Sequence, residues 1–313
     1  MAESADRGKP KSNEPTAKII YRLREKFQLK DILMTIDYPK STYMYWQKRF
    51  KQKDPDTELK QLILEIRDQH KDYGYRRIKA ELRNRGFVVN KKRIQRIMQE
   101  LNLQVTSFSR KSRKYSSYKG TVGKVTPNRI SRRFDTTIPY QKITTDTTEF
   151  KYYENDPSGN LQIKKLYLDP FMDMYNKEIV SYKITKQPNG ITIMEALADA
   201  IKATEKCPFR RTFHSDQGWA YQMKAYGAEL RKDNIFQSMS RKGNCLDNSP
   251  IENFFGLLKQ EMYYGNVFHS YRELEQEIIK YIHYYNHDRI KEKLNWMSPV
   301  HYREHHFSPS LVA

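Results

Sequence analysis

The spacing of apolar residues changes along this chain of 313 residues. Before about residue 103 they recur every three to four positions, which is typical of amphipathic helices, whereas after about residue 137 strand-like runs alternate with helical stretches. The charge changes between the same two parts: residues 1–140 hold 34 Lys and Arg against 15 Asp and Glu, and residues 141–313 hold 23 against 22. The sequence therefore predicts a basic, all-α arm attached to a nearly neutral, mixed α/β domain.

The basic arm favours a polyanion as the partner, and nucleic acid fits it better than a membrane surface does. A merely basic or ribosome-associated protein is the alternative explanation. No apolar run approaches membrane-spanning length, and Cys207 and Cys245 lack metal-ligand spacing, which fits a protein of the reducing cytoplasm. Residues 1–15 are polar, lack the apolar stretch of a signal peptide and are expected to be disordered.

Residues 16–56 are predicted to form a first helix-turn-helix-like unit of three short helices. The second turn contains Pro39, which cannot continue a helix, and Ser41 is placed to cap the helix that follows. Ser41 and Tyr43 are the candidate DNA contacts of this helix. A plain helical bundle is the alternative interpretation.

Residues 57–103 are predicted to form a second helix-turn-helix unit. Gly86 is expected to end one helix in the left-handed conformation, and Asn90 to cap the next helix, which has one apolar and one basic face. Such a helix suits a phosphate backbone or a major groove, although a solvated charged face is the ordinary alternative. The candidate DNA contacts of this unit are Arg76, Arg77, Lys91, Lys92, Arg93 and Arg96.

Residues 104–136 have no helical period and are predicted to be a basic linker. Each DNA phosphate that the linker neutralises would add salt-dependent affinity. Its candidate DNA contacts are Arg110, Lys111, Arg113 and Lys114.

Residues 137–305 are expected to form the α/β domain, and residues 306–313 a short tail. The alternation of patterns predicts a mixed sheet. Strands are expected at 142–153, 161–173, 178–185, 211–215 and 236–240, and helices at 191–204, 221–234, 249–264 and 271–289.

Three acidic residues of this domain are candidate catalytic groups. Asp146 is expected inside the first strand between threonines, Asp216 at the end of a later strand just before Gly218, and Glu252 in the first turn of a helix that Pro250 begins. Each alone has an ordinary explanation, such as a surface carboxylate or a partner of a helix dipole. The combination points to chemistry.

Phosphodiester cleavage requires an activated water or 3′ hydroxyl and charge neutralisation at the leaving oxygen. Two divalent cations about 3.5–4 Å apart accomplish both. Mg²⁺ prefers oxygen ligands and keeps several waters, so three carboxylates suffice, and the sequence contains no Cys/His cluster that would indicate zinc. Asp146, Asp216 and Glu252 are therefore candidate ligands of two Mg²⁺ or Mn²⁺ ions.

Several motifs of the sequence resemble those of one known family. They are the segment YGYRR at 73–77, HSDQG at 214–218, SMSRKGNCLDN at 238–248 leading to ENFF at 252–255, and the stretch 281–303 with Tyr284, Pro299 and Arg303. From about residue 16 to 305 the chain resembles the IS three family of bacterial insertion-sequence transposases, within the DDE transposase and retroviral integrase superfamily. The 35 residues between Asp216 and Glu252 equal the spacing of that family.

The resemblance implies a ribonuclease-H-like catalytic core, with DNA as substrate, two Mg²⁺ or Mn²⁺ ions as cofactors and a homo-oligomer assembled on DNA in the bacterial cytoplasm. It implies that Lys259, seven residues after Glu252, contacts the DNA of the transposon end; an ordinary surface lysine is the alternative. The family usually has Trp where this chain has Ile143. Family members often act as fusions with an upstream reading frame that supplies a leucine zipper, and no sustained heptad pattern is present here.

The leading hypothesis is an enzyme that cuts and joins DNA strands at the terminal inverted repeats of its own element. One alternative is a DNA-binding regulator on an inactive integrase-like scaffold, and another is a general nuclease with a ribonuclease-H-like fold. The three acids and their spacing argue against the regulator, and the basic helical arm argues against the general nuclease.

Overall fold

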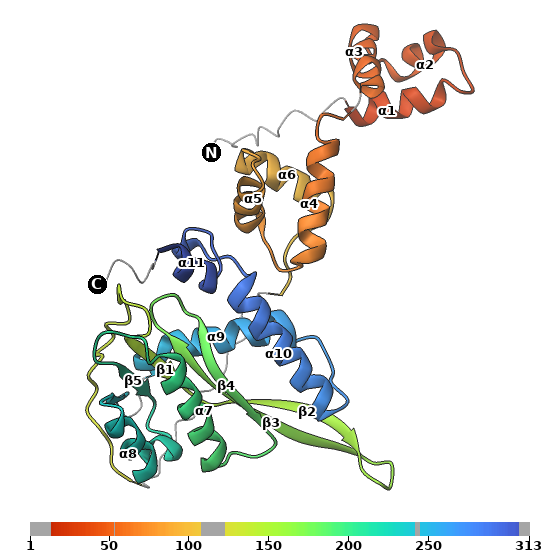
Figure 1. The fold of residues 1–313 in the computed structure, drawn as a ribbon. Coiled ribbons are helices and arrows are strands. Elements are labelled where there is room, and N and C mark those ends of the chain that lie inside the picture. The colour runs from red at the N-terminus through yellow and green to blue at the C-terminus, as the bar shows by residue number, and fades with distance from the viewer. Residues whose placement is uncertain (1–13, 53, 108–122, 242–244, 307–313) are drawn as a thin grey trace, which may run out of the picture. The chain divides into compact units, whose positions relative to one another are not determined.

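The computed structural model of the chain describes residues 14–52, 54–107, 123–241 and 245–306 (Figure 1). The chain forms two compact units, Met1–Glu65 and Ile66–Ala313. The helix α4 (Thr57–Gln69) crosses the boundary between them.

The first unit contains three short helices around a small apolar core. They are α1 (Glu14–Leu23), α2 (Leu29–Ile36) and α3 (Lys40–Lys51). Ala17, Ile20, Ile32 and Tyr43 form the buried centre of this core. The cap predicted at Ser41 is wrong, because α3 begins at Lys40 after Pro39 and makes no side-chain cap bond. Proline fixes the backbone before the first turn, and Ser41 lies inside it.

The second unit begins with a helical part that contains α5 (Tyr75–Asn84) and α6 (Lys91–Glu100). Two predictions for the turn between these helices are confirmed: Gly86 has φ +88°, and the Asn90 side chain accepts a hydrogen bond from the Lys92 N–H (2.9 Å). In α6 the apolar side chains are buried, whereas the basic ones are exposed. The helix therefore has the two faces expected from its sequence.

The rest of the second unit is a six-stranded mixed sheet with helices on both faces. The strands are β1 (Lys142–Thr145), β2 (Thr148–Asn155), β3 (Leu161–Asp173), β4 (Ile179–Thr185), β5 (Thr212–Ser215) and β6 (Phe236–Met239). Strand β3 pairs antiparallel with β1, β2 and β4, whereas β1, β5 and β6 run parallel. This is the mixed α/β architecture expected from the pattern.

The strand predicted at 142–153 is divided in two at Asp146. Both β1 and β2 pair with β3 in one continuous register, which places Asp146 opposite Pro170. The Met174 N–H donates to the Lys142 carbonyl (2.8 Å). In an antiparallel pair, every second residue of a strand directs its N–H toward the same neighbouring strand. By this pattern the N–H of residue 170 would donate to the Asp146 carbonyl. Proline has no N–H, and the ladder is therefore open at Asp146.

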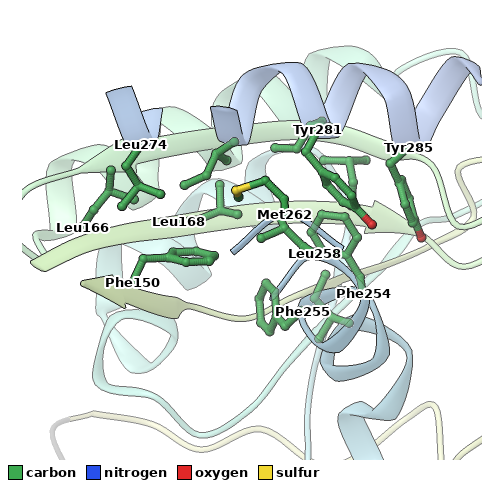
Figure 2. Packing of buried hydrophobic residues seen from close by; sticks show 14 of the residues in the cluster. Phe150, Leu166, Leu168, Phe254, Phe255, Leu258, Met262, Leu274, Tyr281 and Tyr285 are labelled. Carbon is green, nitrogen blue, oxygen red and sulfur yellow. The ribbon is translucent and has the colours of Figure 1, made fainter. Parts of the chain in front are cut away.

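One face of the sheet carries α7 (Gly190–Ala203) and α8 (Lys224–Lys232), and the other carries α9 (Ser249–Leu258) and α10 (Tyr271–His287). The apolar core between the sheet and the helices α9 and α10 contains Phe150, Leu166 and Leu168 from the sheet, together with apolar side chains of these two helices (Figure 2). A short helix, α11 (Pro299–His306), follows. None of the described helices is long and apolar enough to cross a membrane.

Two predicted helices have different bounds in the structure. The helix expected at 221–234 begins with a short 3-10 turn, Trp219–Gln222, before α8. The helix expected at 249–264 is α9 followed by a π-helical turn, Lys259–Tyr263. Such turns are frequent at functional sites.

Candidate active site

Asp146 and Asp216 lie side by side at the ends of neighbouring parallel strands. Thr144 of β1 pairs with His214 of β5, and the same register continued by two residues brings Asp146 next to Asp216. Both residues follow the carboxyl ends of their strands, which is the edge where α/β sheets bind ligands. Because side chains alternate along a strand, both carboxylates face the side of the sheet that α9 covers.

Glu252 reaches this edge from α9. The helix begins at Ser249 with Pro250 in its first turn, and Ile251, Phe254 and Leu258 are buried in the core shown in Figure 2. Glu252 is half-buried beside this apolar stripe. The packing of α9 against the sheet therefore sets the position of the third acid.

Backbone N–H groups orient the two aspartates. The Thr147 N–H donates to Asp146 Oδ1 (2.8 Å), and the Gly218 N–H donates to Asp216 Oδ1 (2.7 Å). A Cβ atom added to Gly218 would lie 2.8 Å from Asp216 Oδ1. Glycine at this position therefore lets the backbone approach the carboxylate, which a larger residue would have to displace.

The pKa values of all three carboxyls are raised. Burial is the main cause at each; the neighbouring charge of Asp216 adds to the shifts of Asp146 and Glu252. Within the described residues, no basic side chain forms an ion pair with any of the three. Among the described residues, the site therefore concentrates carboxyl groups that no basic side chain neutralises through an ion pair.

No three His, Cys, Asp or Glu side chains in the described parts of the chain form a ready-made coordination cage. The donors that the three acids offer are nevertheless carboxylate oxygens, the ligands that hard divalent cations prefer. Electrostatic repulsion separates like-charged carboxylates until a cation neutralises them. The residues present thus fit a divalent metal by donor type and by charge.

A fourth carboxyl, Asp169, lies next to this site. It is 2% exposed, and it accepts a hydrogen bond from Thr147 Oγ1 (2.5 Å). Burial raises the pKa of Asp169 to about 6. The Tyr221 hydroxyl lies 3.4 Å from the same Thr147 oxygen. Asp169 was not predicted from the sequence, because its contact with Thr147 arises only when β3 pairs with the β1–β2 segment.

Comparisons with known proteins agree with the motifs. The chain is 37% identical over 294 residues to the putative transposase InsK for insertion sequence element IS150 of Escherichia coli, which covers 93% of this chain and 99% of that protein. The chain belongs to the IS three family of insertion-sequence transposases. An uncharacterized transposase-like protein of Haemophilus influenzae is 47% identical over 215 residues, which is 69% of this chain and 93% of that protein.

Family models match both parts of this transposase. Residues 54–112 match an HTH-like domain, and residues 136–245 and 252–307 match the integrase core domain. The fold class expected from the sequence, a helical arm followed by an integrase-type core of the ribonuclease-H-like class, is confirmed. The regulator alternative is not favoured by the transposase relatives.

Solved structures include one similar chain titled "Structure of the HTLV-2 integrase catalytic core domain in complex with magnesium (dimeric form)". It covers 52% of this transposase and 94% of its own chain, at 16% identity and a TM-score of 0.38.

The structure places the candidate DNA contacts of the transposase in different environments. Ser41, Arg76, Lys91, Lys92, Arg93 and Arg96 are exposed. Tyr43 is 0% exposed in the core of the first unit, so the predicted DNA contact by its side chain is wrong. Arg77 is turned toward the core, with its guanidinium 3.9 Å from Glu261 and its pKa lowered by burial. Arg110, Lys111, Arg113 and Lys114 lie outside the described residues.

Lys259 is close to the acids, at the start of the π-helical turn. Its Nζ donates to Thr148 Oγ1 (2.6 Å) and lies 5.0 Å from the centre of the Phe150 ring. A groove of about 950 Å³ runs past it, with Glu252 and Lys71 also in its lining. The groove thus brings basic side chains next to one of the three acids.

Asp247 and Asn248 were not predicted as functional residues either, although both lie in the motif SMSRKGNCLDN before Glu252. Each has a buried side chain with several hydrogen bonds to other segments. Two polar residues directly before a helix that carries a candidate catalytic acid were the available signal.

Proposed function

We propose that this transposase cleaves and joins DNA strands at the terminal inverted repeats of its element, with Asp146, Asp216 and Glu252 as the ligands of two Mg²⁺ or Mn²⁺ ions. One observation carries the proposal: three separate segments bring half-buried carboxyls to one sheet edge, where the charge of Asp216 helps to raise the pKa of Asp146 and that of Glu252. Protein structures rarely retain such an arrangement without a cation that offsets it.

The chain's own residues would orient the reacting groups. Asp146 and Asp216 each use one oxygen to accept a backbone N–H, which leaves the second oxygen of each carboxylate to face a ligand. Bound divalent cations would supply the activation of a water or 3′ hydroxyl and the neutralisation of the leaving oxygen. Glu252 would complete the ligand set from α9.

DNA would approach the acids along the groove that contains Lys259. Lys71 and Arg67, which also line it, would contribute positive charge for phosphates. The exposed basic face of α6 and the first helical unit would bind the terminal repeats. The remaining candidate contacts, Ser41, Arg76 and the basic linker, would add phosphate contacts.

We further propose that the transposase acts as a homo-oligomer that binds both ends of the element and the target DNA. An upstream-frame partner protein would supply the oligomerisation helix if the element encodes one. The complex would act on DNA in the bacterial cytoplasm, at the nucleoid.

The test is Mg²⁺-dependent nicking of a labelled duplex that carries the element end, compared with a scrambled duplex of equal length. We expect nicking at the end sequence, loss of nicking with EDTA and little nicking of the scrambled duplex. Equal cutting of both duplexes would indicate a general nuclease. Specific binding without any metal-dependent cutting, with the upstream partner supplied, would contradict the proposal.

A further inference from the structure

The dipeptide Asp247–Asn248 contacts every segment that carries one of the three acids. It directly precedes α9, whose first turn contains Glu252. Its Asn248 side chain is 3% exposed and bridges to β1: Thr144 Oγ1 donates to Asn248 Oδ1 (2.6 Å), and Asn248 Nδ2 donates to the Thr145 carbonyl (3.2 Å). Thr145 is the residue before Asp146, so this amide ties the start of α9 to the first acid.

The main chain of Asp247 makes the corresponding link to Asp216. The Asp247 carbonyl is 2.9 Å from Nε2 of His214, which lies two residues before Asp216 in β5. Since a carbonyl only accepts, Nε2 carries the proton, and burial lowers the pKa of His214 and favours the neutral ring. Nδ1 then accepts from the Ser238 hydroxyl (2.9 Å). Nε2 of this imidazole thus holds β5 to residue 247, and Nδ1 holds β5 to Ser238 of β6.

The Asp247 carboxylate accepts hydrogen bonds from two arginines and an asparagine. Its side chain is 0% exposed, and it accepts from Arg241 Nε (2.9 Å), Arg132 Nε (2.9 Å) and Asn128 Nδ2 (3.0 Å). Hydrogen bonds from the two arginines, Arg241 first, lower the pKa of this carboxyl. The carboxylate is therefore a fixed anion around which Arg241 and two residues of the linker converge.

The linker segment 123–136 makes further contacts with the core. The Arg129 N–H donates to Ser238 Oγ (2.9 Å), the same hydroxyl that donates to His214. The Gly123 N–H donates to Gln222 Oε1 (3.3 Å), and a Cβ atom on Gly123 would overlap the Gln222 carbonyl. The described part of the basic linker, which was predicted to contact DNA, is thus bound to the catalytic core.

We propose that Asp247 and Asn248 are positioning residues for the three acids and that the docked linker holds them in place through Asn128 and Arg132. The proposal rests on the proposed function, because it assumes that the acids bind the cations together. Its consequence is that the linker, which joins the helical arm to the core, sets the geometry of the metal site. Hydrogen-bonded partners of metal ligands commonly change metal affinity 10–100-fold when removed.

The first test measures Mn²⁺ binding to the full chain without DNA, by electron paramagnetic resonance of the unbound ion. We expect Asn248→Ala to weaken Mn²⁺ binding roughly tenfold or more, while affinity for an end duplex in EDTA changes less than twofold. The matched control is Asn286→Ala, since Asn286 is also buried and bridges the Ile179 N–H and carbonyl (both 2.9 Å) on β4, away from the acids. It should destabilise the fold and leave Mn²⁺ binding unchanged.

The linker is tested by a pair of neighbouring arginines. Arg132→Gln should weaken Mn²⁺ binding, whereas Arg133→Gln removes the same charge from a side chain that donates to the Ile130 and Arg129 carbonyls and should not. If both variants behave alike, the linker has no special role. Cleavage by Arg132→Gln should recover at high Mn²⁺, as expected for a positioning defect.

The outcomes separate this inference from the proposed function. If the wild-type chain binds Mn²⁺ and Asp146→Asn does not, the metal site stands; Asn248→Ala with wild-type Mn²⁺ affinity would then overturn the positioning role alone. Absence of Mn²⁺ binding by the wild-type chain would overturn both. Should Asn248→Ala fail to fold, Thr144→Val removes the hydroxyl on the other side of the bridge with little change of shape, and unchanged Mn²⁺ affinity in that variant would overturn the inference.

Discussion

At the scale of single residues, buried carboxyls dominate the electrostatics of the core. Desolvation raises the pKa of Asp169 to about 6 and that of Asp173 to about 7, and it raises those of the catalytic candidates as well. A folded state in which a carboxyl has a raised pKa binds protons more tightly than the unfolded chain does, so stability falls as pH rises through the folded pKa. The metal-free protein should therefore lose stability between acid and neutral pH at these positions.

Asp169 gives a test of whether stability falls as pH rises. Between pH 5 and pH 8 the wild-type protein should lose roughly 1–1.5 kcal/mol through this group, because its folded pKa lies above the ordinary value. Asp169→Asn keeps an oxygen for the Thr147 hydroxyl and removes the titration. Urea unfolding in EDTA at both pH values measures the difference, which should shift in favour of the variant at pH 8. Parallel pH profiles would show that Asp169 ionises normally.

The three acids could be predicted from the sequence because residue type, spacing and flanking motifs coincide. Asp169, Asp247 and Asn248 could not be assigned roles in the same way. Each of them contacts a residue more than twenty positions away along the chain: Thr147 for Asp169, Arg132 for Asp247 and Thr144 for Asn248. The contact of Asp169 depends on strand register, because a one-residue change of register would turn its side chain to the opposite face. Those of Asp247 and Asn248 form only when the turn before α9 packs against β1 and the linker.

At the scale of elements, α6 is the helix whose two faces are most sharply separated. Its first turn starts at the Asn90 cap, and Arg93 and Arg96 are exposed on the basic side. Replacing both by alanine should weaken binding of an end duplex, by roughly 1–3 kcal/mol for each side chain that contacts a base edge. Fluorescence anisotropy with the full chain measures this. A control that removes two exposed lysines from α8, Lys224→Ala with Lys232→Ala, should bind normally; unchanged binding by the α6 variant would remove that helix from recognition.

A buried ion pair joins the π-helical turn to the end of α10. Arg289 is 1% exposed and donates twice to Glu261 (2.6 and 2.8 Å), and the Tyr281 hydroxyl donates to the same carboxylate (2.8 Å). Glu261→Gln should cost about 3–5 kcal/mol of unfolding free energy, because it leaves the guanidinium buried without a counter-charge. Glu277→Gln, which removes an exposed partner of Lys280, should change little. Equal urea midpoints for the two variants would contradict this.

Element boundaries were predictable where a single residue determines them. Gly86 and Asn90 fix the turn before α6 through their own backbone and side-chain preferences. The interruption at Asp146 was not predictable, because it results from Pro170 on a neighbouring strand. Likewise, nothing local in the apolar pattern after α9 distinguishes a π-helical turn from another turn of α-helix.

At the scale of the whole molecule, the division into a basic arm and an α/β core follows from charge and periodicity alone. The described part of the linker modifies this picture, since residues 123–136 contact the core through Arg129 and Arg132. Charge composition does not distinguish a linker bound to DNA from one whose arginines form ion pairs with a buried aspartate. The structure assigns the second role to Arg132.

The arm should nevertheless bind DNA without the core. We expect residues 1–136 to bind the element end, with an affinity that falls by about 10³-fold or more between 50 and 200 mM salt if six or more phosphates are contacted. Anisotropy titrations at several salt concentrations give the slope. A fragment that does not bind at low salt would show that the basic part of the chain serves another purpose.

The central claim is that Asp146, Asp216 and Glu252 act together in one metal-dependent site. The most direct measurement is cleavage of an end-bearing duplex in Mg²⁺ by the full active assembly, with wild-type protein compared with Glu252→Gln. The amide keeps the shape of the side chain and removes one charge, so DNA binding and metal-free stability should be retained or rise. Strand cleavage and strand joining by this variant should both collapse. Near-normal cutting by Glu252→Gln would contradict the three-acid site.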